Sequence, residues 1–331
     1  MPEGHSIHRI ARIIDSLLVG QRVRASSPQG RFTSDAKRLE ATTLTEVFAH
    51  GKHLFMGFNQ DNASAASQLW LHVHLGIYGY WRFTGDERFN AENLALLGEC
   101  DPQPTENESQ LIELKVHSAL DPSERIAHEK FADRWYLTPS PFRVPEPVGT
   151  VRLRLEVPHG VADLCGPNTC ELLEAPGVTQ VLDRLGPDPL QPDADFSEFA
   201  SRCARRRRAI GEMLMDQGII AGVGNIYRAE GLFSVRLDPF RPVQKVSRTK
   251  LRQIWDWLRK VMPSGVETGR VTLMNPDDLA SYLDKHENPD EAVRRYYVYQ
   301  REGYPCVCCG NAVRLATVSG RKLYWCPRCQ C

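Results

Sequence analysis

Apolar residues near the N-terminus recur at helical spacing and end at a glycine, Gly20, which predicts an amphipathic helix. They are Ile7, Ile10, Ala11, Ile14, Leu17 and Leu18. Apolar and β-branched runs follow and predict strands at residues 44–50, 53–59, 69–77, 78–84, 111–117 and 134–138. Gly51 and Lys52 form a tight turn between the first two strands. The first 150 residues therefore predict an α+β arrangement, one helix with a mostly antiparallel β-sandwich.

The second half of the chain has a different pattern. Pro, Gly and Asp interrupt residues 139–195 and predict a linker with short helices, as the Glu- and Asn-rich segment 85–109 predicts a loop. From Phe196 the pattern is helical over residues 196–217, 226–235 and 247–262. We therefore expect a β-sandwich domain at 1–150, a linker at 151–195, a helical domain at 196–295 and a small module at 296–331.

Composition excludes several classes of protein. The chain has 331 residues, of which 42% are hydrophobic and 25% charged, as in globular proteins. No apolar run approaches the ~18 residues of a membrane span. The N-terminus lacks the basic and apolar regions of a secretory signal. These observations predict a cytoplasmic protein without a membrane segment.

The zero net charge hides an asymmetry between the two halves. Residues 1–195 hold 18 Lys and Arg against 27 Asp and Glu, whereas residues 196–331 hold 23 against 14. A basic half on a neutral chain favours one face that binds a polyanion such as nucleic acid. The run Arg205–Arg208 is either such a phosphate-facing turn or a solvated helix face.

Six of the ten cysteines lie in the last 26 residues. Four of them form two C-x2-C pairs separated by sixteen residues: Cys306, Cys309, Cys326 and Cys329. This spacing predicts one tetrahedral Zn²⁺ in a closed, structural site, with a pair of disulfides as the alternative. The segment between the pairs predicts a β-hairpin that turns at Ser319 and Gly320. Cys308 and Cys331 are left outside the pairs.

The N-terminus offers a nucleophile. Removal of Met1 would leave Pro2 with a free secondary amine beside the Glu3 carboxylate. Chain-terminal amines have a pKa of about 7.7–8.0, so a useful fraction is neutral at pH 7. A neutral amine attacks C1′ of a sugar to form an imine, and a neighbouring carboxylate transfers protons. The alternative is an ordinary helix start.

Separated blocks of the sequence also resemble one enzyme family. They are MPEGHSIHRIAR, His50-Gly51-Lys52, GVGNIYRAE at 222–230 and the tail PCVCCG…GRKLYWCPRCQ. In this order they resemble the formamidopyrimidine-DNA glycosylase/endonuclease VIII family of base-excision repair enzymes, and the start is more similar to the endonuclease VIII branch. The resemblance covers essentially the whole chain. It implies a catalytic β-sandwich, a helix–two-turns–helix DNA-binding domain and a zinc finger.

The resemblance also implies a role for individual residues. Pro2 would be the nucleophile and Glu3 the proton-transfer acid, while Lys52 would contact the DNA backbone beside the lesion. Asn225 and Arg321 would bind phosphates, and Ile77 with Tyr78 would fill the space left by a flipped base. Three of these assignments have structural alternatives: a solvated lysine at 52, a left-handed turn residue at 225, and core packing at 77 and 78.

The implied activity is that of a bifunctional DNA glycosylase and abasic-site lyase. It would excise oxidised bases, preferably pyrimidines, and cut the strand by β- and δ-elimination. The expected partner is damaged double- or single-stranded DNA, bound by a monomer at the nucleoid. Alternatives are an oxidised-purine glycosylase, a damaged-DNA-binding protein that has lost the chemistry, and an unrelated zinc-ribbon module of the transcription or ribosome type.

Overall fold

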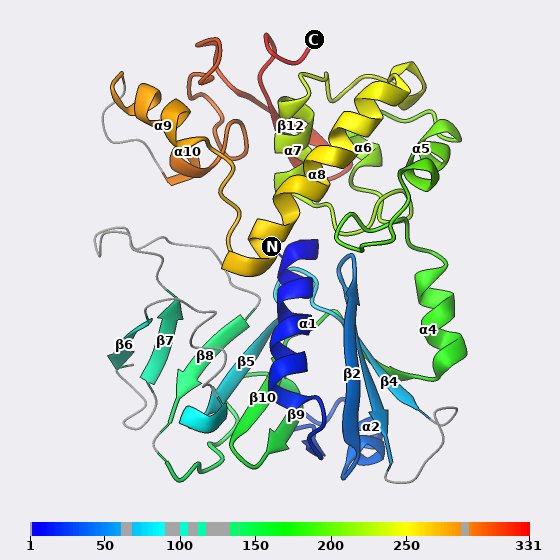
Figure 1. Ribbon diagram of the computed structural model, residues 1–331, viewed down its shortest axis with the longest axis vertical. Helices are drawn as coiled ribbons and strands as arrows, with labels where there is room; N and C mark the ends of the chain where they lie inside the picture. The colour runs from blue at the N-terminus through cyan, green and yellow to red at the C-terminus, as the bar shows by residue number, and fades with distance from the viewer. Residues whose placement is uncertain are drawn as a thin grey trace. The chain divides into compact units, whose positions relative to one another are not determined.

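The computed structural model describes residues 2–60, 68–89, 100–104, 112–116, 133–138, 140–285 and 291–331 (Figure 1). The chain divides into two compact units. The first comprises Pro2 with Ser6–Leu182, and the second comprises Glu3–His5 with Asp183–Cys331. Met1 lies outside the described residues.

The first unit is built on two β-sheets. A seven-stranded sheet has the order β1-β9-β10-β5-β8-β7-β6, and a four-stranded sheet has the order β11-β4-β3-β2. The strands of the larger sheet are β1 (Arg24–Ser26), β9 (Val151–Val157), β10 (Gly160–Cys165), β5 (Tyr80–Gly85), β8 (Asp133–Leu137), β7 (Ile112–Val116) and β6 (Cys100–Pro104). Those of the smaller sheet are β11 (Thr169–Leu173), β4 (Leu69–His74), β3 (His53–Asn59) and β2 (Thr43–His50). Helices α1 (Gly4–Leu18), α2 (Thr33–Leu39) and α4 (Ala175–Leu182) complete the β-sandwich part of the chain.

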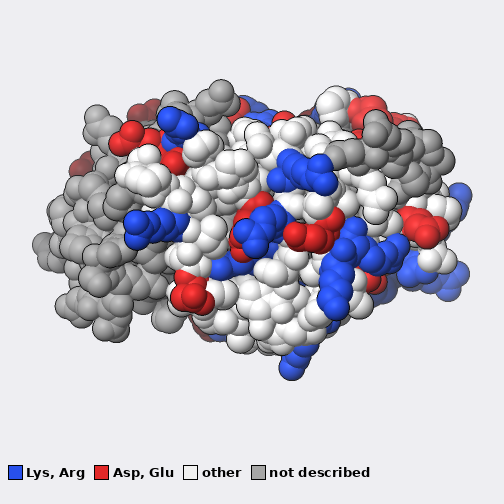
Figure 2. Space-filling model, turned by 90° about the horizontal axis from the view of Figure 1, so that it is seen from below, with Lys and Arg blue, Asp and Glu red and all other residues white. Residues whose placement is uncertain are grey.

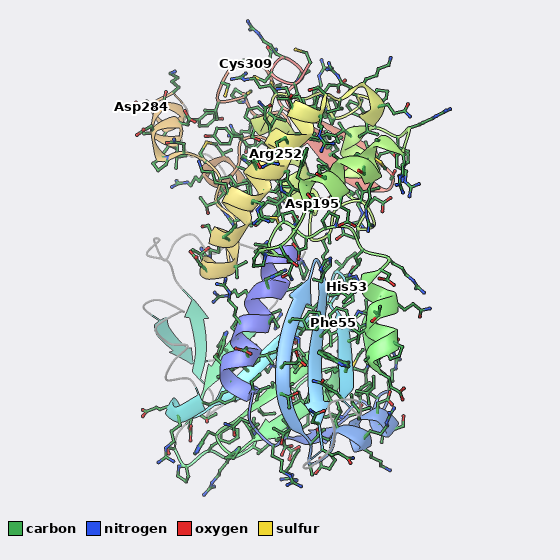
Figure 3. The ribbon with its side chains drawn as sticks, turned by 45° about the vertical axis from the view of Figure 1, so that its right-hand side comes forward. His53, Phe55, Asp195, Arg252, Asp284 and Cys309 are labelled. Atoms are coloured by element: carbon green, nitrogen blue, oxygen red, sulfur yellow. The ribbon has the colours of Figure 1, made fainter. Side chains whose placement is uncertain are left out.

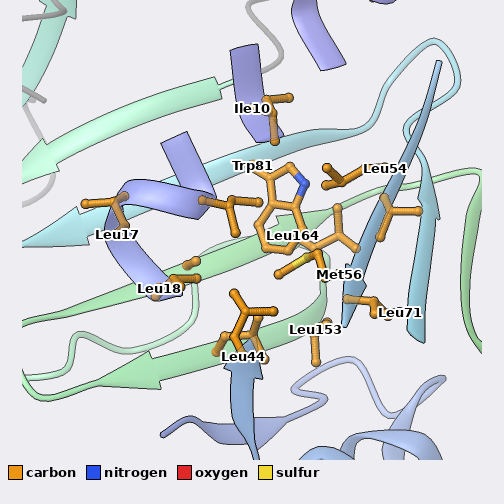
Figure 4. Packing of buried hydrophobic residues seen from close by; sticks show 14 of the residues in the cluster. Ile10, Leu17, Leu18, Leu44, Leu54, Met56, Leu71, Trp81, Leu153 and Leu164 are labelled. Carbon is orange, nitrogen blue, oxygen red and sulfur yellow. The ribbon is translucent and has the colours of Figure 1, made fainter. Parts of the chain in front are cut away.

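The core of this unit lies where α1 and the two sheets meet (Figure 4). On β3 the alternate residues Leu54, Met56 and Phe58 are buried in this core, because successive side chains of a strand point to opposite faces. The other face of β3 and β4 is also apolar, and its Phe55 and Trp70 pack with Val178 of α4. Since both faces of the sheet are covered, these strands lack a polar–apolar alternation.

Helices dominate the second unit. They are α5 (Phe196–Ala204), α6 (Ile210–Met213), α7 (Asn225–Ser234), the 3₁₀ turn η2 (Val243–Lys245), α8 (Arg248–Thr268), α9 (Pro276–Leu283) and α10 (Glu291–Arg295). The hairpin of β12 (Arg314–Val318) and β13 (Arg321–Trp325) follows. The predicted α+β class, with a β-sandwich, a helical part and a C-terminal cysteine module, is confirmed.

Several expectations about individual segments are wrong. The predicted linker at 151–195 contains strands β9, β10 and β11. Pro158, Gly166 and Pro167 lie at the turns between these strands. Asp163 lies within β10, where the buried Arg154 guanidinium donates to both of its carboxylate oxygens, at 2.7 and 2.8 Å. By contrast, the prediction of a mostly antiparallel sandwich is confirmed: among the described strand pairs of this unit, only β5 and β8 pair in parallel.

Two further segments differ from the prediction. Strand β6 falls within the predicted loop 85–109, of which residues 90–99 and 105–109 lie outside the described residues. The predicted helix at 196–217 ends at Ala204 and resumes at Ile210. Arg205–Arg208 therefore lie in the break between α5 and α6, which excludes the solvated helix face as their setting.

The described part of the chain contains no helix that is both long and apolar enough to cross a bilayer. On the face that Figure 2 shows, basic and acidic side chains are interspersed, and neither positive nor negative charge dominates a large area. On the described surface seen from this side, a single-sign patch for a polyanion is therefore absent.

Candidate active site and metal centre

The Glu3 carboxylate lies at the N-terminus of helix α7. It accepts the backbone N–H of Gly224 at 2.9 Å on Oε2 and that of Ile226 at 2.8 Å on Oε1, and only 1% of Glu3 is exposed. The first N–H groups of a helix have no partner within the helix, and the helix dipole favours a negative charge there. Glu3 is therefore fixed by a segment more than 200 residues away in the sequence.

The glycines of the 222–224 segment permit this approach. Gly222 has a φ of +85°, which residues with a side chain rarely adopt, and its carbonyl accepts the Gly4 N–H at 2.8 Å. A Cβ atom on Gly224 would overlap the Glu3 carboxyl group. The conformation of this segment therefore requires glycine at both positions, which is a physical reason for the GVGN pattern.

Asn225 is the first residue of α7, not the left-handed turn residue of the alternative interpretation. Its side-chain Oδ1 accepts from the Arg228 guanidinium at 3.0 Å. The same nitrogen of Arg228 donates to the Lys322 carbonyl on strand β13 at 2.6 Å. This pairing orients the Asn225 amide so that its Nδ2 group is the donor left for a ligand. Arg228 thus ties the start of α7 to the cysteine module.

Sequence reasoning missed two charged residues within the GVGNIYRAE block. Arg228 and Glu230 are each only 1% exposed, and burial lowers the pKa of Arg228 to about 10. Both Glu230 oxygens accept backbone N–H groups from residues 297–299, at 2.8–2.9 Å. Glu230 therefore anchors the segment that precedes the cysteine module. Two opposite charges in an otherwise apolar stretch were the signal that could have identified them.

Four cysteine sulfurs gather at the C-terminus. The Sγ atoms of Cys306, Cys309, Cys326 and Cys329 all lie within 4.8 Å of one another. The Cys306–Cys329 pair is separated by 3.9 Å and the Cys309–Cys326 pair by 3.4 Å. Thiolates at about 2.3 Å from a tetrahedral Zn²⁺ lie about 3.8 Å apart, so the four donors fit that ion. All four are free thiols, against the disulfide alternative, and Cys308 and Cys331 are exposed outside the cluster.

The hairpin between the cysteine pairs presents Arg321. Ser319 and Gly320 form its turn with φ values of +49° and +73°, and Arg321 directly follows as the first residue of β13. Arg321 is exposed and lies close enough to Arg228 to oppose the charge of that guanidinium.

Lys52 occupies the predicted turn of the first unit. His50 and His53 pair at the ends of β2 and β3, and Gly51 adopts a φ of +59° between them. Lys52 is half-buried, and its charge contributes to the lowered pKa of His53 and of His74. The alternative of a freely solvated lysine at a hairpin tip therefore does not describe its surroundings.

Ile77 and Tyr78 lie between β4 and β5 and are exposed by 56% and 70%. Packing in the core, the alternative that the sequence left open, is excluded. Large apolar side chains with this exposure are suited to contact a partner. Pro2 belongs to the same unit and is buried, two residues before the start of α1.

Comparison with known proteins assigns the chain to a family. Residues 1–127 match the formamidopyrimidine-DNA glycosylase N-terminal domain, and residues 185–277 match the formamidopyrimidine-DNA glycosylase H2TH domain. The protein named endonuclease 8 1 of Mycobacterium tuberculosis is 37% identical over 333 residues, which cover 100% of both chains. The chain belongs to the formamidopyrimidine-DNA glycosylase/endonuclease 8 family of DNA glycosylases. This membership excludes an unrelated zinc-ribbon module.

Formamidopyrimidine-DNA glycosylases are similar to the chain over a shorter stretch of sequence or at lower identity. Formamidopyrimidine-DNA glycosylase of Thermus thermophilus is 39% identical over 150 residues, which are 45% of this chain and 55% of that protein. The fold is shared with Lactococcus lactis Fpg in complex with DNA containing N7-benzyl-Fapy-dG, with a TM-score of 0.67 at 18% identity over 99% of each chain. Fpg of Thermus thermophilus gives a TM-score of 0.61 at 24% identity, over 99% of this chain and 98% of that one.

Proposed function

We propose that the chain is a bifunctional DNA glycosylase and abasic-site lyase that acts on oxidised bases in damaged DNA, pyrimidines in preference. The observation that carries this proposal is the Glu3 carboxylate held at the start of α7, immediately after Pro2 in the sequence. A buried carboxylate fixed by two backbone donors has a defined position, and it directly follows the residue that would bear the chain-terminal amine once Met1 is removed. Family membership supplies the reaction class.

The proposed reaction begins at the Pro2 nitrogen. The secondary amine attacks C1′ of the damaged nucleotide as the glycosidic bond breaks, and Glu3 passes the proton that the Pro2 nitrogen loses to the departing base. The C1′–O4′ bond of the sugar then opens, O4′ takes up a proton, and the C1′–nitrogen bond becomes an iminium. The iminium acidifies the C2′ proton. Loss of that proton expels the 3′-phosphate by β-elimination, and δ-elimination then expels the 5′-phosphate.

The remaining predicted residues would hold the DNA. Lys52, Asn225 and Arg321 are assigned to phosphates, which position a duplex without reading its sequence. Ile77 and Tyr78 are assigned to the space that base flipping opens, a step that costs a few kcal/mol. A Zn²⁺ bound by the four cysteines would be structural, because all four positions are taken by protein sulfur, and it would hold the hairpin that bears Arg321.

The proposed preference for pyrimidines rests on how much of the chain each group of relatives matches. The endonuclease 8 relative matches the full chain, whereas the formamidopyrimidine-DNA glycosylase relative matches 45% of it. An oxidised-purine preference is the second candidate, since both family domains bear the formamidopyrimidine-DNA glycosylase description. A protein that binds damage without chemistry is the third.

A set of duplexes that each contain one lesion tests the proposal. We expect the purified protein to release thymine glycol and dihydrouracil faster than 8-oxoguanine or formamidopyrimidines, and to cut the strand at each released base. Base release is measured by mass spectrometry and cutting by gel. Faster release of the purine lesions would establish the second candidate, and binding without release or cutting would establish the third.

A further inference from the structure

A row of polar residues crosses the outer face of the four-stranded sheet beside the Lys52 turn. His53 lies on β3, His72 on β4 and Glu171 on β11, which are three adjacent strands. In the register of the strands, Glu171 is directly opposite His72. Phe55 is opposite His72 on the other side, so His53, two residues before Phe55, is the diagonal neighbour of His72. Figure 3 shows His53 above Phe55 on this sheet, at the end nearer the turn. At this end of the sheet, histidines replace the apolar residues that α4 covers further along the same face.

Two hydrogen bonds connect these side chains. His72 Nδ1 lies 2.8 Å from a Glu171 carboxylate oxygen, and His72 Nε2 lies 2.8 Å from His53 Nδ1. An ionised carboxylate only accepts, so His72 must donate from Nδ1. Neutral His72 then accepts at Nε2, and His53 must donate from Nδ1. The chain of bonds therefore assigns one tautomer, with the proton on Nδ1, to both histidines.

The surroundings keep the two histidines of the row uncharged and rigid. Burial lowers the pKa of His53 to about 3, and the charge of Lys52 and any protonation of His72, His74 or His50 act in the same direction. Burial also lowers the pKa of His72, although Glu171 opposes that shift. The His72 ring stacks on His53 and on Phe55, with centroids 5.1 and 4.8 Å apart. A protonated His53 would repel the adjacent Lys52 ammonium, so a neutral His53 leaves that ammonium in place.

We propose that Glu171, His72 and His53 form a hydrogen-bonded chain that positions the β2–β3 turn and directs Lys52 to a DNA phosphate. His53 directly follows Lys52, so fixing its ring fixes the backbone on one side of the turn. The three are positioning residues for the DNA contact of Lys52, and this inference rests on the function proposed for that lysine. Glu171 is suited to a test because its side chain is 49% exposed, so its replacement leaves the core intact.

A double-mutant cycle with Lys52 tests the inference. Affinity for a duplex with a tetrahydrofuran abasic-site analogue is measured for the wild type, Glu171→Leu, Lys52→Ala and the double variant. We expect Glu171→Leu to weaken binding about threefold to tenfold, the usual effect of one lost hydrogen bond. In the Lys52→Ala background the same change is expected to have no effect. Equal loss in both backgrounds would overturn the inference. No loss in Lys52→Ala alone would instead overturn the proposed role of Lys52.

Matched variants separate positioning from folding. Glu171→Gln retains an acceptor for His72 and is expected to restore binding to within about twofold of wild type. Glu174→Gln removes an exposed acid three residues away and is expected to change nothing. Nitrogen NMR of the imidazoles gives a second readout: His53 and His72 are expected as Nδ1–H tautomers, and His72 is expected to lose this single form in Glu171→Leu. Nε2–H tautomers in the wild type would also overturn the inference.

Discussion

Replacing Glu3 with glutamine is expected to slow base release by about 100-fold or more, the usual contribution of a positioned acid or base. Cutting at a pre-formed abasic site is expected to slow much less, because an exposed aldehyde condenses with the Pro2 amine without departure of a base. The two rates are measured in single-turnover experiments on a lesion duplex and on an abasic duplex. Equal slowing of both steps would contradict the assignment of Glu3 as the acid for base loss.

Glu3→Gln would also disturb the hydrogen bonds at the start of α7, and this effect on folding requires a control. A glutamine NH₂ group would face the backbone N–H of Gly224 or Ile226, where both partners are donors. Thermal stability must therefore be measured alongside the rates. Gly224→Ala displaces the Glu3 carboxyl group without removing its charge and is expected to slow base release in the same selective way. Glu302→Gln, an exposed acid, is expected to leave both rates unchanged.

Loss of the metal is expected to weaken DNA binding about 10- to 100-fold while leaving the β-sandwich folded. Cys306→Ser removes one of four donors, so the metal content is expected to fall toward zero and the hairpin with Arg321 to unfold. The lost charged hydrogen bonds are worth about 1.5–3 kcal/mol each, which gives that range of affinity. Metal content is measured by atomic emission, affinity by fluorescence anisotropy, and folding of the sandwich by thermal melting.

The exposed cysteines provide the control for this experiment. Cys308→Ser and Cys331→Ser are expected to keep one zinc per chain and full affinity, because both thiols lie outside the cluster. If Cys306→Ser retained the metal and bound DNA normally, one of these two residues would have replaced it and the ligand assignment would be wrong.

The parts of the fold that follow local rules were predictable. The helix of residues 4–18 and the hairpin turning at Gly51 and Lys52 are determined by short-range periodicity and turn chemistry. The segment 151–173 was not, because the Pro and Gly residues at its turns resemble a linker and the paired charges of Arg154 and Asp163 conceal that both of their strands are buried. Periodicity shows which positions are buried or exposed, but it does not show which residues pair across strands.

The candidate site also has parts that the local sequence predicts and parts that it does not. The cysteine spacing predicted a four-sulfur cluster because C-x2-C pairs determine local geometry. The cap that Glu3 makes on α7 joins residues 3 and 224, and the hydrogen-bonded row joins residues 53, 72 and 171. No local pattern encodes such contacts, and only the sheet register and the glycine-lined approach bring these groups together.

Covalent trapping at Pro2 tests the central claim most directly. Borohydride added during turnover is expected to reduce the imine to a stable amine that links protein to lesion DNA, and mass spectrometry is expected to place the link on residue 2 of a chain without Met1. A chain that retains Met1 is expected not to trap, because its Pro2 nitrogen is a tertiary amide without a nucleophilic lone pair. Full trapping by a Met1-retaining chain, lost on Lys52→Ala, would make Lys52 the nucleophile and contradict the assignment of Pro2.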